Sequence, residues 1–409
     1  MPKSLPSLVL FPPPPSPATP ASLSAAYRPS LDSIVTTLKG LETSTELLIV
    51  LPCPSLHGRL HLPRPEIYPE AQGLLAGLYS LICLVCANLG ADVDSDTPGA
   101  IDSRILLLDY NSSLTFQTDL DVSLDTFISG PIIDLPTFSI TRRQWNLIFS
   151  VDGEEGQQLL SAYTNLSNRV SPPVVGELRT VRGGVSLVHN APRPALPAKT
   201  SRSHNIVIVG GTFDYIHAGH KLLLTAMALL LQPASRTSTA PRRLIVGLTG
   251  DELLKNKKYA EFIRSWDQRQ QDVVNFFQSI LSFTRAGQEE AFETIEYNEA
   301  VPNGRAVHTK LKNGLITIEC VEIQDPFGPT ITDESITAIV VSGETRSGGQ
   351  AVNEKRAAKG WHTLEIFEVD VLDTEEHEEG ASKIGDFASK ISSTAVRKRI
   401  AERARTSSL

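Results

Sequence analysis

Residues 206–221 read IVIVGGTFDYIHAGHK, and this stretch decides the fold of the carboxyl-terminal half. Four consecutive apolar residues, 206–209, predict a strand that is buried on both faces, and the residues from 219 to 231 have helical apolar spacing. The turn between them carries two glycines and then two histidines three residues apart. A strand, a glycine turn and a helix in this order predict the first unit of a parallel sheet.

The alternation of strands and helices continues along the chain. Further apolar strands are expected at 244–248, 316–323, 338–343 and 364–372, with helices near 266–283 and 350–359. Such alternation is typical of a parallel sheet that helices cover on both faces. We therefore expect an α/β fold, a Rossmann-like doubly wound parallel sheet, in residues 204–409. The charged stretch 285–313 interrupts the pattern, and we expect it to be a surface insertion.

The amino-terminal half is predicted to form a smaller α/β domain over residues 31–170, with no site that the sequence identifies. The signals are three apolar runs and one helix-like stretch, which lie at 46–51, 104–108, 145–151 and 71–89. Cys83 and Cys86 have the spacing of a redox or half-zinc motif. Their neighbours are apolar and no second cysteine pair exists, so a core helix is the favoured interpretation.

Two segments have the composition of flexible chain. Residues 1–30 are rich in proline, serine and alanine, and we expect a flexible tail there. Residues 171–203 are rich in proline, glycine and basic residues, and we expect a linker. The second domain should then begin near residue 204.

Composition excludes several classes of protein. The chain has 38 Lys and Arg against 46 Asp and Glu, a net charge of -8 that disfavours non-specific binding of nucleic acid. Four cysteines are too few for a disulfide framework. The most apolar window, 74–89, falls short of the roughly 20 residues that cross a bilayer, and the amino terminus lacks the pattern of a signal peptide. We expect a cytoplasmic protein without a membrane partner.

The turn after the first strand suits a phosphate ligand. Gly210 and Gly211 allow backbone N–H groups to approach a phosphate, and the helix that opens near Gly219 directs its positive end to the same place. His217 and His220 can face that ligand and become charged beside it, so that they stabilise negative charge. The alternatives are a metal site or helix capping. The turn is not G-x-G-x-x-G, which disfavours a dehydrogenase.

The H-x-G-H turn resembles the signature of the nucleotidylyltransferase superfamily, whose members attack the α-phosphate of a nucleoside triphosphate. Residues 391–397, ISSTAVR, are similar to the second motif of that superfamily, which opens a helix and holds the β- and γ-phosphates. Their hydroxyls, and the basic residues that follow them, fit that role. A serine cap on an ordinary solvated helix is the alternative for this segment alone.

The acceptor is suggested by a finer resemblance. Four further segments, 246–251, 253–258, 325–330 and 341–353, are similar to the eukaryotic phosphopantetheine adenylyltransferases of monofunctional, fungal type, and to the matching half of animal coenzyme A synthase. This resemblance implies transfer of AMP from ATP to 4′-phosphopantetheine, with Mg²⁺ bound through the ATP phosphates and no metal ligands from the protein. A G-x-x-x-x-G-K-[ST] motif is missing, so we expect the next kinase step on another protein, and other coenzyme A enzymes as candidate partners.

The resemblance also implies a role for each candidate residue. The catalytic set is His220, His217 and Lys255. The set that binds ATP and its phosphates is Gly210, Gly211, Thr212, Phe213, Gly219, Ser392, Ser393, Thr394 and Arg397. The set that binds the acceptor is Lys257, Lys258 and Arg346, although a lysine run is equally typical of a solvated helix end. Two other functions stay open: a nucleotidylyltransferase for nicotinamide mononucleotide or a phospho-alcohol, and a non-catalytic scaffold of coenzyme A enzymes.

Overall fold

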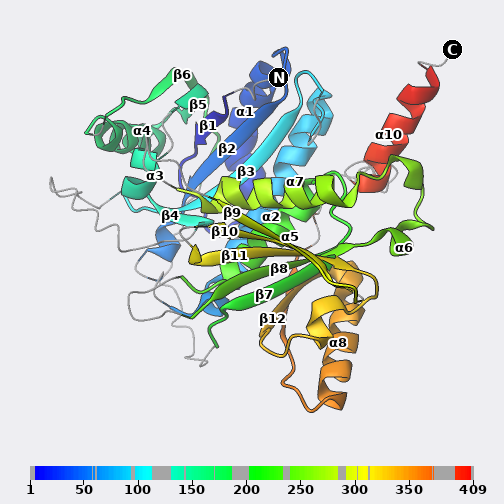
Figure 1. Ribbon diagram of the computed structural model, residues 1–409. Helices are drawn as coiled ribbons and strands as arrows, with labels where there is room; N and C mark the ends of the chain where they lie inside the picture. Colours follow the sequence, from blue (N-terminus) through cyan, green and yellow to red (C-terminus); the bar gives the residue numbers. More distant parts are fainter. Residues whose placement is uncertain are drawn as a thin grey trace. The chain divides into compact units, whose positions relative to one another are not determined.

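The computed structural model consists of two compact units, and each is described by itself (Figure 1). The first unit comprises Met1–Arg202, Pro233–Ser238 and Ile280–Glu289, and the second comprises Ser203–Gln232, Thr239–Ser279 and Glu290–Leu409. The structure describes residues 5–57, 59, 62–93, 97–112, 130–141, 144–169, 171–186, 202–233, 240–283, 292–301, 303–311, 314–370, 372 and 392–406.

The first unit is built on a six-stranded sheet in which every neighbouring pair of strands is parallel. Its strands are β1 (Ser7–Leu10), β2 (Thr45–Pro52), β3 (Ile101–Asp109), β4 (Ile132–Asp134), β5 (Gln144–Val151) and β6 (Val175–Val181). They lie in the order β4-β3-β2-β1-β5-β6, so the winding direction changes between β1 and β5. This is the arrangement of a doubly wound sheet.

Four helices accompany this sheet: α1 (Pro20–Lys39), α2 (Tyr68–Leu89), α3 (Leu135–Thr141) and α4 (Glu154–Ser167), with 3₁₀ turns η1 (Pro54–Leu56) and η2 (Arg64–Glu66). Helix α1 packs against α2, and α3 packs against α4. Helix α2 is long and apolar enough to cross a bilayer, but most of its side chains, including those of Cys83 and Cys86, are buried inside the unit. The expected buried helix is therefore confirmed.

The expectation of a flexible tail over residues 1–30 is wrong. Strand β1 lies in the interior of the sheet, between β2 and β5, and all four of its residues are buried. After the prolines at 12–15, Thr19 caps α1: its Oγ1 accepts from the N–H of Ser22 at 3.2 Å, and Pro20 occupies the first helical position, where a missing N–H costs nothing. The composition of this segment concealed a strand of only four residues and a well-capped helix.

The expected linker is also partly wrong. Residues Val175–Val181 form β6, which pairs in parallel with β5 from Gln144 to Val151. Proline and glycine on either side of a short edge strand produce the composition of a linker, because an edge strand needs few apolar residues. Residues 187–201 of that segment lie outside the described residues.

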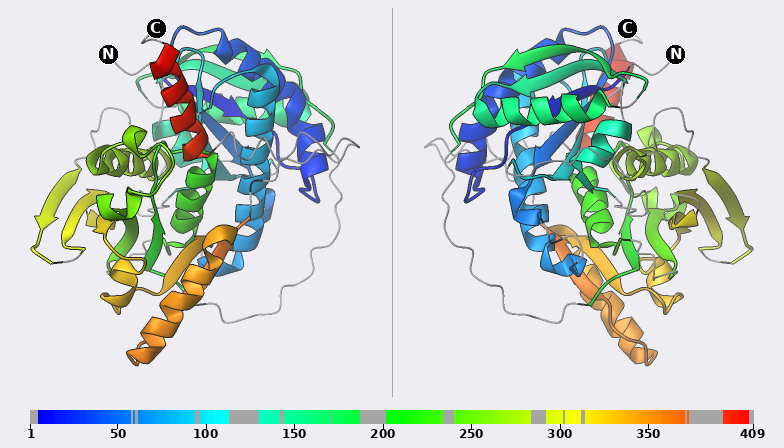
Figure 2. Two further views of the ribbon diagram at one scale, coloured as in Figure 1. Left: turned by 90° about the vertical axis from the view of Figure 1, so that its right-hand side faces the viewer. Right: turned by 90° about the vertical axis from the view of Figure 1, so that its left-hand side faces the viewer.

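The second unit contains a seven-stranded sheet in the order β13-β12-β7-β8-β11-β10-β9. Its strands are β7 (Ile206–Gly211), β8 (Arg242–Thr249), β9 (Glu293–Asn298), β10 (Arg305–Leu311), β11 (Ile316–Ile323), β12 (Ala338–Ser342) and β13 (Glu365–Val369). Five strands, from β13 to β11, run parallel, which confirms the expected Rossmann-like fold. Strands β10 and β9 continue the sheet antiparallel, so this part of the expected surface insertion is a hairpin (yellow in Figure 2).

The helices of the second unit are α5 (Ala218–Leu230), α6 (Asp251–Leu254), α7 (Trp266–Leu281), α8 (Arg346–Ala358) and α10 (Ser393–Thr406), with 3₁₀ turns η3 (Ala260–Phe262), η5 (Gly328–Ile331) and η6 (Gly343–Thr345). Helix α5 packs on β7, β12 and β13, and Val352 of α8 belongs to a core cluster with Ile206, Ile245 and Val341. Because β7 pairs in parallel with both β8 and β12, the carboxyl ends of these three strands lie at one edge of the sheet, from which the candidate residues extend.

Candidate functional site

The turn between β7 and α5 has a tightly folded backbone. Strand β7 ends at Gly211, and His217 is the N-cap residue of α5. Phe213 and Tyr215 have φ values of 49° and 48°, in the left-handed region that side chains rarely adopt. Phe213 is fully buried, and a Cβ at Gly211 would lie only 2.8 Å from its ring. Glycine is therefore needed at 211 for the phenylalanine to fold beneath the turn.

The two histidines of the turn stack on each other. Their ring centroids lie 3.9 Å apart, and the ring of Phe213 lies 5.0 Å from that of His220. Among the described residues, the Nδ1 atoms of His217 and His220 are buried and have no hydrogen-bond partner. Burial lowers the pKa of His217 to about 4, and burial together with His217 holds the pKa of His220 well below its usual range. Both rings are therefore neutral near pH 7, and they would take up a proton there only if a bound anion raised their pKa values.

This neutrality predicts that acid destabilises the second unit. A histidine in the unfolded chain titrates near pH 6.5, whereas His217 does so at about 4, so between these values the unfolded chain binds more protons. Stability is complete above about pH 6.5 and is lost as the pH falls toward 4. Thermal unfolding at pH 7 and pH 5 should show this loss, and the double variant His217→Gln and His220→Gln should reduce it. The exposed His362, changed to Gln, is the control, and an equal loss in the double variant would contradict the assignment.

Asp214 joins the turn to α10. Its side chain is fully buried, and Arg397 Nη1 donates to its Oδ2 at 2.6 Å. Its Oδ1 accepts from the backbone N–H of Arg264 at 3.1 Å, and its carbonyl oxygen accepts from Ser393 Oγ at 2.7 Å. The structure thus brings together the two motifs, which lie nearly two hundred residues apart in the sequence.

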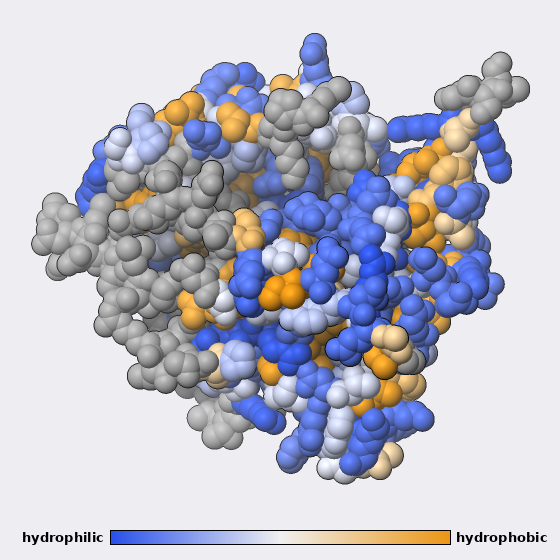
Figure 3. Space-filling model, in the orientation of Figure 1, coloured by the Kyte–Doolittle hydropathy of each residue, from blue (hydrophilic) through white to orange (hydrophobic). Residues whose placement is uncertain are grey.

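The guanidinium of Arg397, near the start of α10, donates hydrogen bonds to three different residues. Besides its ion pair with Asp214, its Nε donates to the carbonyl oxygen of Lys258 at 3.2 Å, and Nη2 donates to Thr394 Oγ1 at 3.2 Å. Ser392 Oγ accepts from the N–H of Ala395 at 3.3 Å, as expected for a helix cap. Hydrophilic side chains project from the rest of α10 (upper right in Figure 3).

The three lysines that follow β8 differ in their surroundings. Burial and the charge of Arg397 lower the pKa of Lys257, while Asp214 raises it, so this ammonium group lies close to the junction of the motifs. The charge of Lys257 in turn contributes to lowering the pKa of His220. Lys255, predicted to be catalytic, forms an exposed ion pair with Glu252 at 2.6 Å. Lys258 reaches Arg397 through its backbone carbonyl.

Arg346 occupies a different place from the histidine cluster. It begins α8, beyond the carboxyl end of β12, and its guanidinium forms two hydrogen bonds with Glu368, at 2.7 and 2.6 Å. The pair is exposed to solvent. The predicted acceptor role of Arg346 would require it to exchange this partner for a phosphate.

Arg269 is a component of the site that the sequence did not reveal. Its side chain is fully buried, and its three nitrogens donate to three carbonyl oxygens: those of Thr212 at 2.8 Å, Thr249 at 2.9 Å and Arg264 at 3.1 Å. Its hydrogen-bond partners are neutral carbonyl groups, and the carboxylates of Asp214, Asp251 and Glu322 act on it at longer range. The buried guanidinium therefore contributes positive potential at the edge where β7 and β8 end, which these carboxylates partly offset.

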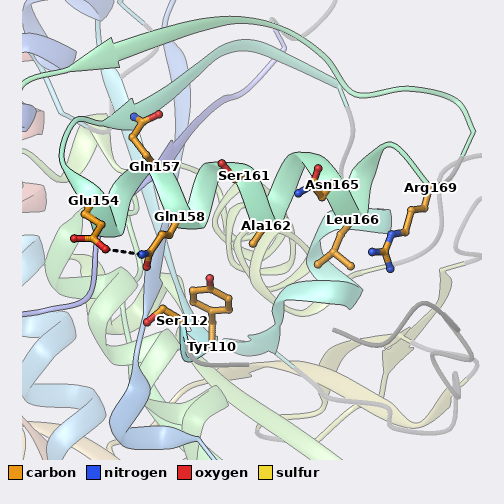
Figure 4. Close-up of a pocket in the computed structure, with 10 residues that line it drawn as sticks. All are labelled: Tyr110, Ser112, Glu154, Gln157, Gln158, Ser161, Ala162, Asn165, Leu166 and Arg169. Atoms are coloured by element: carbon orange, nitrogen blue, oxygen red, sulfur yellow. Dashed lines mark hydrogen bonds between the residues drawn. The ribbon is translucent and has the colours of Figure 1, made fainter. Parts of the chain in front are cut away.

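The first unit has a surface hollow of about 630 Å³ along α4 (Figure 4). Amide and hydroxyl side chains of α4 line it, together with Tyr110 and Ser112 beyond the end of β3. Its acid, Glu154, accepts a hydrogen bond from Gln158 at 3.0 Å, and its base, Arg169, lies at the opposite end of the helix in Figure 4. None of the predicted site residues lies in this hollow.

Comparisons with known proteins concern both halves of the chain. A family model described as "Domain of unknown function (DUF8446)" matches residues 1–187. A phosphopantetheine adenylyltransferase of Thermococcus gammatolerans is 31% identical over 191 residues, which cover 47% of this chain and 86% of the archaeal protein. The chain belongs to the phosphopantetheine adenylyltransferase family. Another protein of that name, from Saccharomyces cerevisiae, is 32% identical over 200 residues, 49% of this chain and 50% of the yeast protein.

A longer match has no assigned activity. An uncharacterized protein of Schizosaccharomyces pombe is 30% identical over 261 residues, which cover 63% of this chain and 66% of that protein. The chain thus spans less than two thirds of the length of this relative, and half of the length of the Saccharomyces cerevisiae family member. The names of the family members indicate enzymes of the nucleotidyltransferase type.

Proposed function

We propose that the second unit is a pantetheine-phosphate adenylyltransferase, which transfers AMP from ATP to 4′-phosphopantetheine and yields dephospho-coenzyme A and pyrophosphate. The observation that carries the proposal is the junction at Asp214, where the H-x-G-H turn and the start of α10 share a buried carboxylate. Membership of the family supports the choice of acceptor. We also propose that it is an enzyme of the monofunctional, fungal type, similar to the matching half of animal coenzyme A synthase.

In the proposed reaction an oxygen of the 4′-phosphate of the acceptor attacks the α-phosphorus of ATP in line. The bond from the α-phosphorus to the oxygen that bridges to the β-phosphorus breaks, and pyrophosphate leaves with that electron pair. A phosphate monoester is already anionic at neutral pH, so no general base is required. Alignment of the two reactants can supply about 7–11 kcal/mol of the barrier reduction.

The turn after β7 would bind the phosphates of ATP. Backbone N–H groups at Gly210 and Gly211, the hydroxyl of Thr212 and the amino-terminal end of α5 at Gly219 would surround them. Phe213, buried below, would keep the turn in shape. His220, supported by the stacked ring of His217, would stabilise the charge that develops on the α-phosphoryl group.

The start of α10 would hold the leaving pyrophosphate through Ser392, Ser393 and Thr394, with Arg397 in a fixed orientation. Lys257 is the lysine whose surroundings best suit the acceptor phosphate, because it lies within electrostatic reach of His220 and Arg397. Lys255 and Lys258 would act from the same loop at longer range.

Magnesium would enter bound to ATP and would neutralise part of the charge of its phosphates. The residues of the site fit a metal that is held by ATP and not by the protein. The buried carboxylate of Asp214 already accepts hydrogen bonds from Arg397 and from the backbone of Arg264, so it is not offered as a metal ligand. We further propose cytoplasmic residence and association with other coenzyme A enzymes, including the kinase for the next step.

The test is release of pyrophosphate by the full chain with ATP and Mg²⁺. Phosphopantetheine should support release, with dephospho-coenzyme A identified by mass, while nicotinamide mononucleotide and a phospho-alcohol should not. Preference for either of these acceptors would transfer the proposal to another nucleotidylyltransferase. Failure with every acceptor, by a protein that is folded by circular dichroism, would favour the non-catalytic scaffold.

A further inference from the structure

Strand β6 forms an open edge of the first unit. Among the described strands it pairs with β5 alone, and six of its seven residues are exposed (green strand at the outer margin in Figure 1). Val175 and Leu178 are 55% and 52% exposed, an unusual state for large apolar side chains on a strand. An open edge offers backbone donors and acceptors to another strand, and proteins commonly protect such edges.

The backbone of β6 fixes which residues point outward. The carbonyl oxygen of Val181 accepts from the N–H of Asp152 at 2.9 Å, so the backbone groups of Val181 face β5. Along a strand this direction alternates with every residue. The backbone groups of Gly176, Leu178 and Thr180 therefore point away from the sheet and are available to a new strand.

The sequence of β6, VGELRTV, is complementary to itself in one antiparallel register. Placing Leu178 opposite Leu178 of a second copy sets Glu177 opposite Arg179, and Val175 opposite Val181. The outward backbone groups then face each other and can form about six main-chain hydrogen bonds. Each charged side chain meets the opposite charge, and each exposed apolar side chain meets an apolar one, both of which stabilise a sheet.

Neighbouring registers lack this complementarity. A register centred on Glu177 sets two carboxylates opposite each other, and a register centred on Arg179 does the same with two guanidinium groups, which is destabilising. Another edge strand, β9 of the second unit, carries Glu293 and Glu296 and no basic residue, so two copies of it would repel each other.

We propose that the edge of β6 is the docking site for a second copy of this chain, through antiparallel pairing of β6 with β6 about a two-fold axis at Leu178. The paired sheets then form one continuous sheet of twelve strands, six from each copy. The contact area of two short strands is small, so we expect a weak dimer that forms in the micromolar range.

Charge reversal tests this register. Full-length protein should change from monomer to dimer between about 1 and 100 µM in sedimentation equilibrium. Glu177→Arg and Arg179→Glu should each raise the dissociation constant about tenfold or more, because each sets like charges opposite one another. An equimolar mixture of the two variants restores opposite charges at both positions, and native mass spectrometry should show the heterodimer. Glu296→Lys, on the edge strand β9, is the matched control and should dimerise as the parent does.

Each of three results would overturn the proposal. The parent protein could stay monomeric over the whole concentration range, the single variants could dimerise as well as the parent, or the mixture could form no heterodimer. Circular dichroism and the thermal midpoint of each variant establish that it is folded. Both positions are exposed, so charge reversal there should leave the fold unchanged.

Discussion

Replacing His220 with alanine should lower the turnover number about 10²-fold or more and leave the fold intact. The ring lies between Phe213 and His217 at the start of α5, and its Nδ1 has no hydrogen-bond partner among the residues that the structure describes. A preorganised group that stabilises the charge of the transition state typically contributes a factor of this size. The measurement is single-turnover formation of dephospho-coenzyme A from ATP and phosphopantetheine.

The exposed His362 provides the matched control, because its replacement with alanine removes an imidazole outside the site. That variant should retain the turnover of the parent. A His220→Ala protein with near-normal single-turnover rates, and an unchanged thermal midpoint, would refute the role of this histidine. The result bears on the mechanism separately from the choice of acceptor, which the pyrophosphate assay decides.

Replacing Arg397 with methionine should destabilise the second unit by about 3–5 kcal/mol. The change leaves the carboxylate of Asp214 fully buried without its guanidinium partner, which lies 2.6 Å away in the protein. The loss of stability arises from the unpaired buried carboxylate. Replacing Asp214 with asparagine in the same chain should therefore restore a large part of the lost stability. Hydrogen exchange measured by mass spectrometry on peptides of α5 and α10 reports the stability of this unit.

Arg346→Met serves as the control for that experiment. It removes an arginine from an ion pair that is exposed to solvent, and such pairs contribute little to stability. If Arg397→Met lowered the stability of the second unit no more than Arg346→Met does, the ion pair of Arg397 with Asp214 would not be what holds α10 to the turn.

The parallel core of the second unit was predictable because buried strands are apolar along their whole length. Residues 206–209 and 244–248 show this pattern, and both lie in parallel strands. Three of the four residues of β1 carry the same signal in a segment whose average composition is that of disordered chain. Averaging over thirty residues hid a strand that neighbouring strands bury on both sides.

The site was predictable to the level of its two motifs and no further. Their meeting at Asp214 depends on tertiary structure, and so does the choice of Lys257 over Lys255, because both lysines look alike in the sequence. The neutral state of the histidines follows from burial, which spacing does not reveal. Arg269 lies in a helix that carries no motif, and its three carbonyl partners come from distant segments.

The prolines between β1 and α1 have a consequence for the first unit. As in a nucleotide-binding sheet, the winding direction changes beside the first strand, and residues 12–15 lie in the turn after that strand, where such sheets commonly bind a phosphate. Proline has no N–H group, and the Thr19 side chain already accepts from the N–H of Ser22 at the start of α1. Residues 12–15 therefore offer no main-chain donors of the kind that bind a diphosphate in dinucleotide-binding domains, and an anion bound at this turn would depend more on side chains.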